Sequence, residues 1–471
     1  MTTVAKLRRL PAIDRLLNDP ALEGVIALYG RAVVTVQARD ELDALRQLVL
    51  ADVGDSGLES PDHGVFESRL ASLPARIASR VESQLGGLQR VINATGIFVH
   101  TNLGRAPLPT EVMAEVAPLL AGYCDLEMSL ATGRRAERNR RVIPLLRALC
   151  GAPSSLVTNN NAGALVLALT ALAKGREVIV SRGELVEIGG SFRVPDILEA
   201  SGARLVEVGT TNRTRLDDYR RAIGPETAML LKVHPSNYRI VGFTEETSAR
   251  ALAGLAKEAD LPLLVDEGSG LLIRDQSPQL RDHESLHQLL EAGAGLVCGS
   301  GDKVLGGPQA GLLLGQADLV ERCRKHPLYR AMRPDGFTFS ALEAVLRRRL
   351  AGRDMPMDRL WKPQDERLER LAKLLEAAGL EVSIVNADAY LGGGAAAERP
   401  IPGRALAVPG GESLFVALRS ARPAVLGYVR EDRLLLDLRT VEPVDDDTLA
   451  DSIIKASKAH TSDSLGEADA G

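Results

Sequence analysis

The chain has 471 residues, of which 45% are hydrophobic and 25% are charged. At roughly 150 residues per domain this length predicts two or three domains, and the composition excludes a mainly disordered or collagen-like chain. The formal net charge of −5 argues against indiscriminate nucleic-acid binding, because such proteins usually carry a basic excess. Four widely spaced cysteines and no long apolar run predict a cytoplasmic protein without disulfides, signal peptide or membrane span.

The first part of the chain shows two stretches of helical spacing. Apolar residues recur every three or four positions through residues 5–50 and again through 66–85. Residues 52–64 between these stretches are small, polar and turn-rich, which is typical of a linker. These patterns predict a helical N-terminal domain over residues 1–65 and a connecting helix over residues 66–90.

From about residue 91, short apolar runs alternate with amphipathic stretches. This alternation is typical of βαβ units around a mainly parallel sheet, whose ligands bind beyond the carboxyl ends of the strands. We predict a large α/β domain over residues 91–340, a smaller α+β domain over 341–455 and a disordered tail over 456–471. The expected strands of the large domain cover residues 155–158, 177–181, 204–209, 228–233, 261–266, 296–300 and 311–315.

Three segments that follow these strands carry polar residues. Asn160, Asn161 and Ala162 open a helix, whose N–H groups form either an ordinary cap or a cup for phosphate. Asp266 ends a buried strand, and such a residue alone indicates a helix cap or a metal ligand. Lys303 follows the next strand in a glycine-rich turn, where a crowded lysine becomes a good Schiff-base nucleophile. Taken alone, Lys303 would be an ordinary loop lysine in solvent.

Together, a phosphate cup, a carboxylate and a lysine are what pyridoxal phosphate requires. The lysine attaches the cofactor, the carboxylate keeps the ring nitrogen protonated, and the helix N-terminus holds the phosphate. Along the chain, the phosphate cup comes first, Asp266 second and Lys303 third. This is the order found in the type I, aspartate-aminotransferase-like fold. Ser300 could add a hydroxyl to the phosphate site. His234 either contacts the ring or substrate, or is a satisfied structural histidine.

Arginines at three further positions are candidates for anion binding. Arg105 precedes the sheet, and Arg330 and Arg333 follow it three residues apart, which places these two on one face of a helical turn. In an arginine-rich chain the alternative is ordinary surface charge. Residues 283–287, HESLH, match the zinc motif HExxH, but their polar setting and the lack of a third ligand nearby predict no metal site.

The chain also contains long motifs that reach from its N-terminal part to the end of the large domain. They are LRRLPAIDRLL (7–17), INATGIFVHTNLGRAPL (92–108), TNNNAGALVLAL (158–169), SRGELVEIGGSFRVPDILEASGARLVEVGTTNRT (181–214), KVHPSNYRIVGFTEE (232–246), VDEGSGLL (265–272), SGDKVLGGPQAGLLLG (300–315) and HPLYRAMRPD (326–335). These motifs resemble the bacterial L-seryl-tRNA(Sec) selenium transferases, also called selenocysteine synthases.

The resemblance implies a pyridoxal-phosphate enzyme that converts L-seryl-tRNA(Sec) to L-selenocysteinyl-tRNA(Sec). β-Elimination of the seryl hydroxyl would give an aminoacrylyl intermediate, to which selenium from selenophosphate adds. In this chemistry Lys303 holds the cofactor and acts as general base, and Asp266 is the partner of the pyridinium nitrogen. The resemblance also implies that Arg105, Arg330 and Arg333 hold selenophosphate or the phosphate that leaves it.

The resemblance further implies a homodecamer, no DNA or membrane partner, and an N-terminal domain that grips the serine-charged tRNA(Sec). The first 15 residues contain one acidic residue, Asp14, and four basic residues, Lys6, Arg8, Arg9 and Arg15. This local excess predicts a basic patch for tRNA phosphates on a protein that is acidic as a whole.

One loop before the sheet departs from the family pattern. Asp125, Ser129 and Ala136 stand where Asn, Asp and Gly are expected, which leaves the role of this loop open. The alternative function is a related pyridoxal-phosphate lyase or transferase acting on a small amino acid or amino sugar phosphate, although such relatives tend to lack the N-terminal module. A non-catalytic tRNA-binding protein is a third hypothesis, against which Asp266 and Lys303 together argue.

Overall fold

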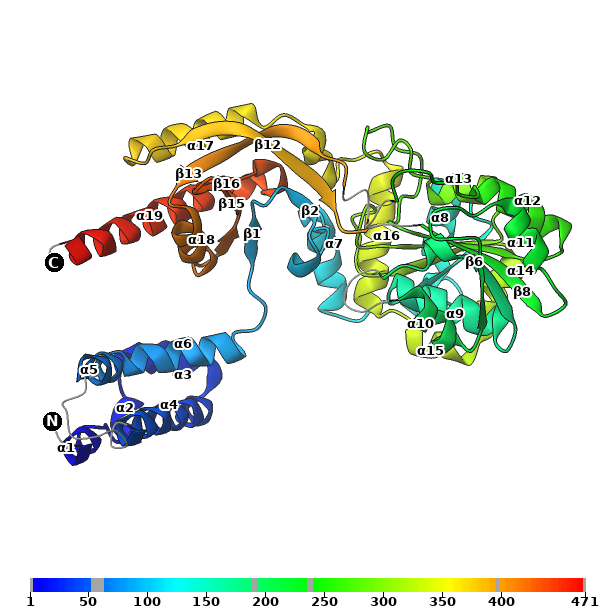
Figure 1. Cartoon of the computed structure of the whole chain (residues 1–471). Coiled ribbons are helices and arrows are strands. Elements are labelled where there is room, and N and C mark those ends of the chain that lie inside the picture. Colours follow the sequence, from blue (N-terminus) through cyan, green and yellow to red (C-terminus); the bar gives the residue numbers. More distant parts are fainter. Residues whose placement is uncertain (1–2, 52–62, 188–192, 235–239, 395–397, 469–471) are drawn as a thin grey trace. The chain divides into compact units, whose positions relative to one another are not determined.

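The computed structural model of the chain describes residues 3–51, 63–187, 193–234, 240–394 and 398–468. The chain divides into two compact units, Met1–Arg90 and Val91–Gly471, here called the N-terminal unit and the main unit (Figure 1). No helix within the described ranges is long and apolar enough to cross a membrane.

The N-terminal unit is helical throughout its described part. Its last helix buries Leu73, Ile77 and Val81 in the same core as two earlier helices, α3 and α4. The predicted connecting helix over residues 66–90 is instead two helices, His63–Ala71 and Leu73–Leu85, and both belong to this unit because their apolar faces are covered there. The predicted linker over 52–64 lies almost wholly outside the described residues. The helices are α1 (Thr3–Arg8), α2 (Ile13–Leu16), α3 (Pro20–Tyr29), α4 (Arg31–Ala51), α5 (His63–Ala71) and α6 (Leu73–Leu85).

The predicted basic patch is smaller than expected. Lys6 is only 5% exposed, so its charge is not presented to solvent. Arg9 donates a hydrogen bond from Nη2 to Oε2 of Glu67 at 2.8 Å. Arg8 and Arg15 are exposed. The sequence predicted a larger patch because it does not show that Lys6 is buried and that Arg9 is hydrogen-bonded to Glu67 of α5.

The main unit contains the predicted, mainly parallel sheet. Its seven strands lie in the order β5-β11-β10-β9-β8-β6-β7, and only β11 runs antiparallel to its neighbours. Every strand expected in the large domain is present, with bounds that differ by at most two residues, whereas the strand-like run at residues 413–418 of the small domain forms a helix. The strands are β5 (Ser154–Thr158), β6 (Glu177–Ser181), β7 (Arg204–Val208), β8 (Thr227–Val233), β9 (Leu263–Gly268), β10 (Leu296–Ser300) and β11 (Gly311–Gly315).

Helices cover both faces of this sheet, which explains why its strands are apolar on both sides. Val178 and Val180 of β6 lie in one apolar cluster and Ile179 in another, as the alternation of a strand requires. The first cluster contains residues of α9 (Asn161–Ala173), α10 (Val194–Ser201), α14 (Ala317–Lys325) and α15 (Pro327–Met332). The second contains residues of α7 (Thr110–Leu120), α8 (Val142–Cys150), α11 (Leu216–Ala222), α12 (Ala249–Glu258), α13 (Leu286–Glu291) and α16 (Gly336–Leu350).

A smaller α+β part completes the main unit, and it includes residues from both ends of the unit. Strands β1 (Val91–Asn93) and β2 (Ile97–Val99) pair with strands of the C-terminal segment. The predicted boundary at residue 91 therefore differs from the structure, which puts residues 91–99 in the small part. The other elements are α17 (Asp365–Ala377), β12 (Ser383–Gly392), β13 (Ile401–Pro409), α18 (Gly411–Arg419), β14 (Ala424–Leu426), β15 (Tyr428–Arg430), β16 (Arg433–Leu436) and α19 (Asp446–Ala468).

Helix α19 (Asp446–Ala468) continues into the segment that was predicted as a disordered tail. Leu449, Ala450 and Ile453 of this helix are buried in the core of the small part, with Ile454 and Ala456 packed against it. A helix anchored in this way extends into a segment whose Ser, Ala and Asp content alone indicates disorder.

A buried ion pair joins the strands of the small part. Asp437 is 0% exposed and accepts hydrogen bonds from Nε and Nη2 of Arg439 at 2.9 and 2.6 Å. The same guanidinium donates to the carbonyl oxygens of Ile401 on β13, at 2.6 Å, and Ala387 on β12, at 3.0 Å. Asp437 also donates its N–H to the carbonyl of Ala94 at 2.9 Å, so the pair connects the first strands of the unit to the last.

Candidate active site

Lys303 lies in the turn after β10 and is largely buried. Its side chain packs on the small α+β part, because a methyl group built on Gly394 would stand 2.2 Å from Nζ. Burial lowers the pKa of Lys303, the carboxylate of Asp266 opposes this only in part, and the positive charge of Arg105 lowers the pKa further. Lys303 therefore loses its proton more easily than a surface lysine, which suits a nucleophile and proton acceptor.

Asp266, the fourth residue of β9, is 4% exposed and lies beside the N-terminus of α9. Nδ2 of Asn161 donates to its Oδ1 at 2.8 Å, and Sγ of Cys298 lies 3.5 Å from the same oxygen. Burial raises the pKa of Asp266, while Asn161 and the charge of Lys303 oppose the rise. The side chain of Asn161 thus orients the carboxylate, while its backbone N–H remains at the start of α9 (Asn161–Ala173).

The first turn of α9 combines the two alternatives left open by the sequence. Oδ1 of Asn160 accepts the N–H of Gly163 at 2.8 Å, which is an ordinary helix cap. The N–H groups of Asn161 and Ala162 come earlier in the turn, where a helix offers no acceptor, and they can bind a phosphate. Ser300 ends β10 and is 5% exposed.

A buried chain of polar groups extends from Asp266. The N–H of His234 donates to the carbonyl of Asp266 at 2.9 Å, and its ring centre lies 4.2 Å from that of His283. Nε2 of His283 is 2.7 Å from Oε1 of Glu267, which also accepts a hydrogen bond from Ser269. Burial alone would raise the pKa of Glu267, but the hydrogen bonds from His283 and Ser269 lower it, so this carboxylate stays charged.

Glu267 and Ser269 were not among the predicted site residues, although both lie in the DEGSG segment at the end of β9. His283 entered the sequence predictions only as part of HExxH. In the structure His283 precedes α13 and faces Glu267, whereas Nδ1 of His287 is 3.1 Å from the carbonyl oxygen of Cys150. The two imidazoles thus have different surroundings, unlike the paired ligands of a zinc helix.

His234 predicts a pH dependence of stability. Burial and the adjacent His283 lower its pKa from 6.5 to about 4. The unfolded chain therefore binds more protons than the folded one between these values, and the free energy of unfolding should fall as the pH drops from about 6.5 to 4. In urea unfolding of the cofactor-free protein, His234→Gln should flatten this slope. An unchanged slope would show that His234 is not held neutral.

Arg105 is positioned beside Lys303 through the neighbouring Asp302. Its backbone has a φ of 68°, and its N–H donates to the carbonyl of His100 at 3.0 Å. Nη1 of Arg105 lies 2.6 Å from Oδ2 of Asp302, which is buried. The structure therefore brings together Lys303 and one of the three arginines expected to bind an anion.

Arg330 and Arg333 lie at the end of α15, which contacts the first turn of α9. The carbonyl of Met332 accepts the N–H of Asn159 at 2.9 Å. Arg330 is exposed, while Nε of Arg333 is buried and has no hydrogen-bond partner among the described residues. An unsatisfied guanidinium nitrogen beside a helix N-terminus is suited to an anionic ligand.

The loop whose role the sequence left open pairs with several arginines, among them Arg333. Glu127 accepts a hydrogen bond from Nε of Arg138 at 2.6 Å and lies 3.8 Å from Nη1 of Arg333. Asp125 accepts from Nη2 of Arg140 at 3.2 Å and also pairs with Arg141, whose hydrogen bond lowers the pKa of Asp125. Two short strands, β3 (Met128–Ser129) and β4 (Arg134–Arg135), form the hairpin between them.

These residues fit pyridoxal phosphate. A largely buried lysine, a buried carboxylate and the free N–H groups of a helix N-terminus are present, as the cofactor requires. Two buried polar atoms near Asp266, Oδ1 of Asn161 and Nδ1 of His234, have no partner among the described residues. Such atoms are costly to leave unpaired and are available to a polar ligand.

Comparison with known proteins identifies the family. Residues 91–442 match the family described as L-seryl-tRNA selenium transferase, and residues 7–46 match the family described as selenocysteine synthase N terminal. The chain belongs to the L-seryl-tRNA selenium transferase family. A relative in this family, L-seryl-tRNA(Sec) selenium transferase of Hyphomonas neptunium, is 44% identical over 92% of this chain and 95% of its own length. That of Carboxydothermus hydrogenoformans is 41% identical over 92% and 94%.

The fold of this family member is also found in a solved structure. D-glucosaminate-6-phosphate ammonia-lyase superposes with a TM-score of 0.57 at 22% identity, over 80% of this chain and 98% of the lyase. This chain therefore has the predicted type I fold, with a helical N-terminal unit and a smaller α+β part. Family and fold together indicate pyridoxal phosphate as its cofactor.

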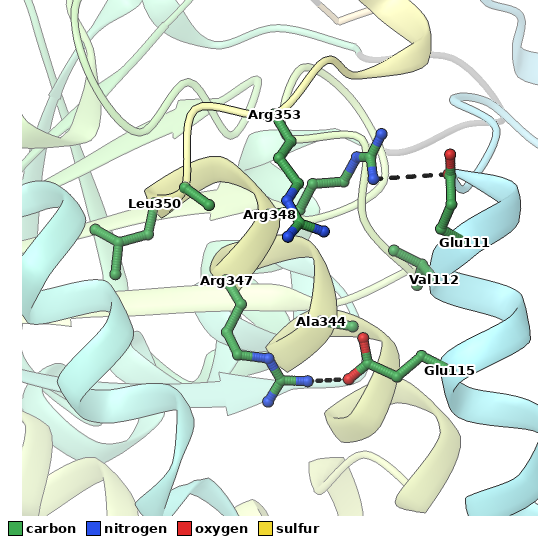
Figure 2. Close-up of a pocket in the computed structure, with 9 residues that line it drawn as sticks. Glu111, Val112, Glu115, Ala344, Arg347, Arg348, Leu350 and Arg353 are labelled. Carbon is green, nitrogen blue, oxygen red and sulfur yellow. Dashed lines mark hydrogen bonds and ion pairs between the residues drawn. The ribbon is translucent and has the colours of Figure 1, made fainter.

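A further cavity of about 550 Å³ lies between α7 and α16 of the main unit (Figure 2). Arginines of α16 line it, and Figure 2 shows them directed at glutamates of α7. Arg347 pairs with Glu115, and Nη1 of Arg348 lies 3.7 Å from Oε2 of Glu111. Acidic residues therefore compensate these two cations, while Arg353 also lines the cavity.

Proposed function

We propose that this selenium transferase converts L-seryl-tRNA(Sec) to L-selenocysteinyl-tRNA(Sec) with selenophosphate as the selenium donor. The proposal rests on one observation: Lys303, Asp266 and the first turn of α9 lie close together. The chain that contains them matches both the selenium transferase family and the selenocysteine synthase N-terminal family. The alternative lyase function is not favoured, because residues 7–46 match the selenocysteine synthase N-terminal family.

Pyridoxal phosphate, when bound, accepts the electron pair that remains when the serine Cα loses its proton. Asp266, with its carboxylate fixed by Asn161, holds the proton on the ring nitrogen and so keeps the ring electron-withdrawing. Nζ of Lys303, whose pKa is lowered by burial, takes the Cα proton and can return it to the departing hydroxyl. The N–H groups of Asn161 and Ala162 bind the phosphate.

Arg105, Arg330 and Arg333 bind selenophosphate and the phosphate released from it. Support comes from the buried unpaired Nε of Arg333 and from the contact between α15 and α9. Arginine suits this role because its planar fork donates two parallel hydrogen bonds to an oxyanion.

Replacing Arg333 by lysine tests this role. The substitution keeps the charge but removes the fork, so the KM for selenophosphate should rise about 10-fold or more, the usual value of a hydrogen bond to a charged group. The KM for seryl-tRNA should change less. Arg322→Lys, on the exposed face of α14, is the matched control. An unchanged KM for selenophosphate in Arg333→Lys would contradict the assignment.

We further propose that the N-terminal unit contacts the tRNA, with Arg8 and Arg15 as its exposed cations near the N-terminus. The enzyme would act in the cytoplasm as a homodecamer. The four cysteines are unpaired, which is compatible with a reducing compartment.

The test of the function is direct. The enzyme loaded with pyridoxal phosphate is incubated with seryl-tRNA(Sec) and selenophosphate, and selenocysteinyl-tRNA is measured after digestion of the tRNA. Product should appear with tRNA(Sec) and not with the ordinary serine tRNA. Turnover of free amino acids or amino sugar phosphates, without selenocysteinyl-tRNA, would favour the lyase instead.

A further inference from the structure

A pocket of about 400 Å³ lies at the edge of the five-stranded sheet, where β2 pairs with β12. His100, Thr101 and Asn102 form one side, and Tyr390 with residues 392–393 forms the other. We call this the His100 pocket. Its volume lies in the range of small-ligand sites.

The His100 pocket directly adjoins the turn of Lys303. Three consecutive glycines form the link: a methyl group on Gly393 would stand 2.9 Å from Oγ1 of Thr101, and one on Gly394 would stand 2.2 Å from Nζ of Lys303. Adjacent Cα atoms are about 3.8 Å apart. A ligand in the pocket therefore lies within one or two residues' length of the lysine.

The chemistry of the His100 pocket differs from that of the anion site. Its lining contains no Asp, Glu, Lys or Arg. Burial lowers the pKa of His100, so its imidazole is neutral near pH 7. Nδ1 of His100 is buried without a hydrogen-bond partner among the described residues. The pocket thus offers an aromatic face and neutral hydrogen-bonding groups, which suit an uncharged, flat, polar ligand rather than a phosphate.

We propose that the His100 pocket binds the 3′-terminal adenosine of the seryl-tRNA, an inference that rests on the proposed function. The serine is esterified to a ribose hydroxyl of that nucleoside, so its Cα is two bonds from the ester oxygen. When Cα is beside Lys303, the nucleoside must lie within a few ångströms, where this pocket is. Tyr390 stacks on the base, and His100 and Asn102 bind the ribose or the base edge.

The test compares two hydrolysis-resistant analogues of the seryl ester on the cofactor-loaded enzyme, in the absence of selenophosphate. One is 3′-(L-serylamino)-3′-deoxyadenosine, which carries the nucleoside on a stable amide, and the other is L-serinamide, which lacks it. Binding is followed by the change in cofactor absorbance. The adenosine probe should bind at least 10-fold more tightly, and Tyr390→Ala should remove most of this advantage, as expected for the loss of one stacked base.

Two further variants separate recognition from folding. Tyr390→Phe keeps the ring and should bind the adenosine probe like the wild type, whereas Tyr390→Leu keeps the bulk and should behave like Tyr390→Ala. Serinamide should bind equally to all four proteins. Equal affinity of the wild type for both probes, or an equal loss of both in Tyr390→Leu, would overturn the inference.

The outcome is distinguishable from failure of the proposed function. If the wild type makes selenocysteinyl-tRNA but does not prefer the adenosine probe, the pocket assignment alone is wrong. If the wild type prefers the adenosine probe through Tyr390 but makes no selenocysteinyl-tRNA, the pocket assignment stands and the proposed reaction is wrong.

Discussion

Lys303→Ala is expected to abolish the formation of selenocysteinyl-tRNA. Loss of the proton acceptor alone costs about 10²–10⁴-fold in rate, and the same residue is expected to attach the cofactor. Lys303→Arg should be as inactive as Lys303→Ala, because a guanidinium does not lose its proton. The measurement is single-turnover conversion of seryl-tRNA(Sec), with each variant saturated in pyridoxal phosphate.

Lys257→Ala, on the exposed surface of α12, is the control and should retain full activity. Borohydride treatment followed by peptide mass spectrometry should place the cofactor's mass on the peptide of Lys303 in the wild type and the control. Substantial activity in Lys303→Arg would contradict the role of Lys303 as base. A cofactor mass retained on another lysine would contradict its role in attachment.

Arg439→Leu is expected to give the largest loss of stability. It leaves the carboxylate of Asp437, which is 0% exposed, without its counterion. Breaking a buried pair in this way costs about 3–5 kcal/mol in the free energy of unfolding. Two carbonyl oxygens, of Ile401 and Ala387, also lose their donors. The measurement is urea unfolding, with the transition of the main unit followed by circular dichroism.

Arg404→Ala provides the comparison, because Arg404 pairs with Asp365 on the surface and both side chains are more than one-third exposed. A surface pair is worth about 0–1 kcal/mol, so the two variants should differ several-fold. Similar losses in Arg404→Ala and Arg439→Leu would show that Asp437 becomes protonated or hydrated without cost.

Local sequence predicted the sheet well because its strands are buried on both faces. The apolar runs 177–181, 296–300 and 311–315 coincide with β6, β10 and β11. The positions of Asp266 and Lys303 at or just after the ends of neighbouring strands also predicted that their side chains lie near each other. Residues that follow parallel strands lie at the same edge of a sheet.

Contacts that join distant segments could not be predicted in this way. Gly394 packs on Lys303 from a different part of the fold, and His283 contacts Glu267 through a loop with no regular period. Asn161 was assigned to a phosphate because its position in the helix is visible in the sequence, whereas its distance to Asp266 is not. The burial of Lys6 likewise depends on α5, which is far from it in the chain.

The pairing of β1 with β14 has a consequence for how the chain folds during synthesis. Val91 pairs with Ala424, so its partner is translated about 330 residues later. At about 5–20 residues per second this delay is on the order of 15–70 s. Loop-closure entropy also makes such distant pairing slow. The α+β part therefore forms only after these later strands have been translated, and until then residues 91–99 lack the strands with which they pair.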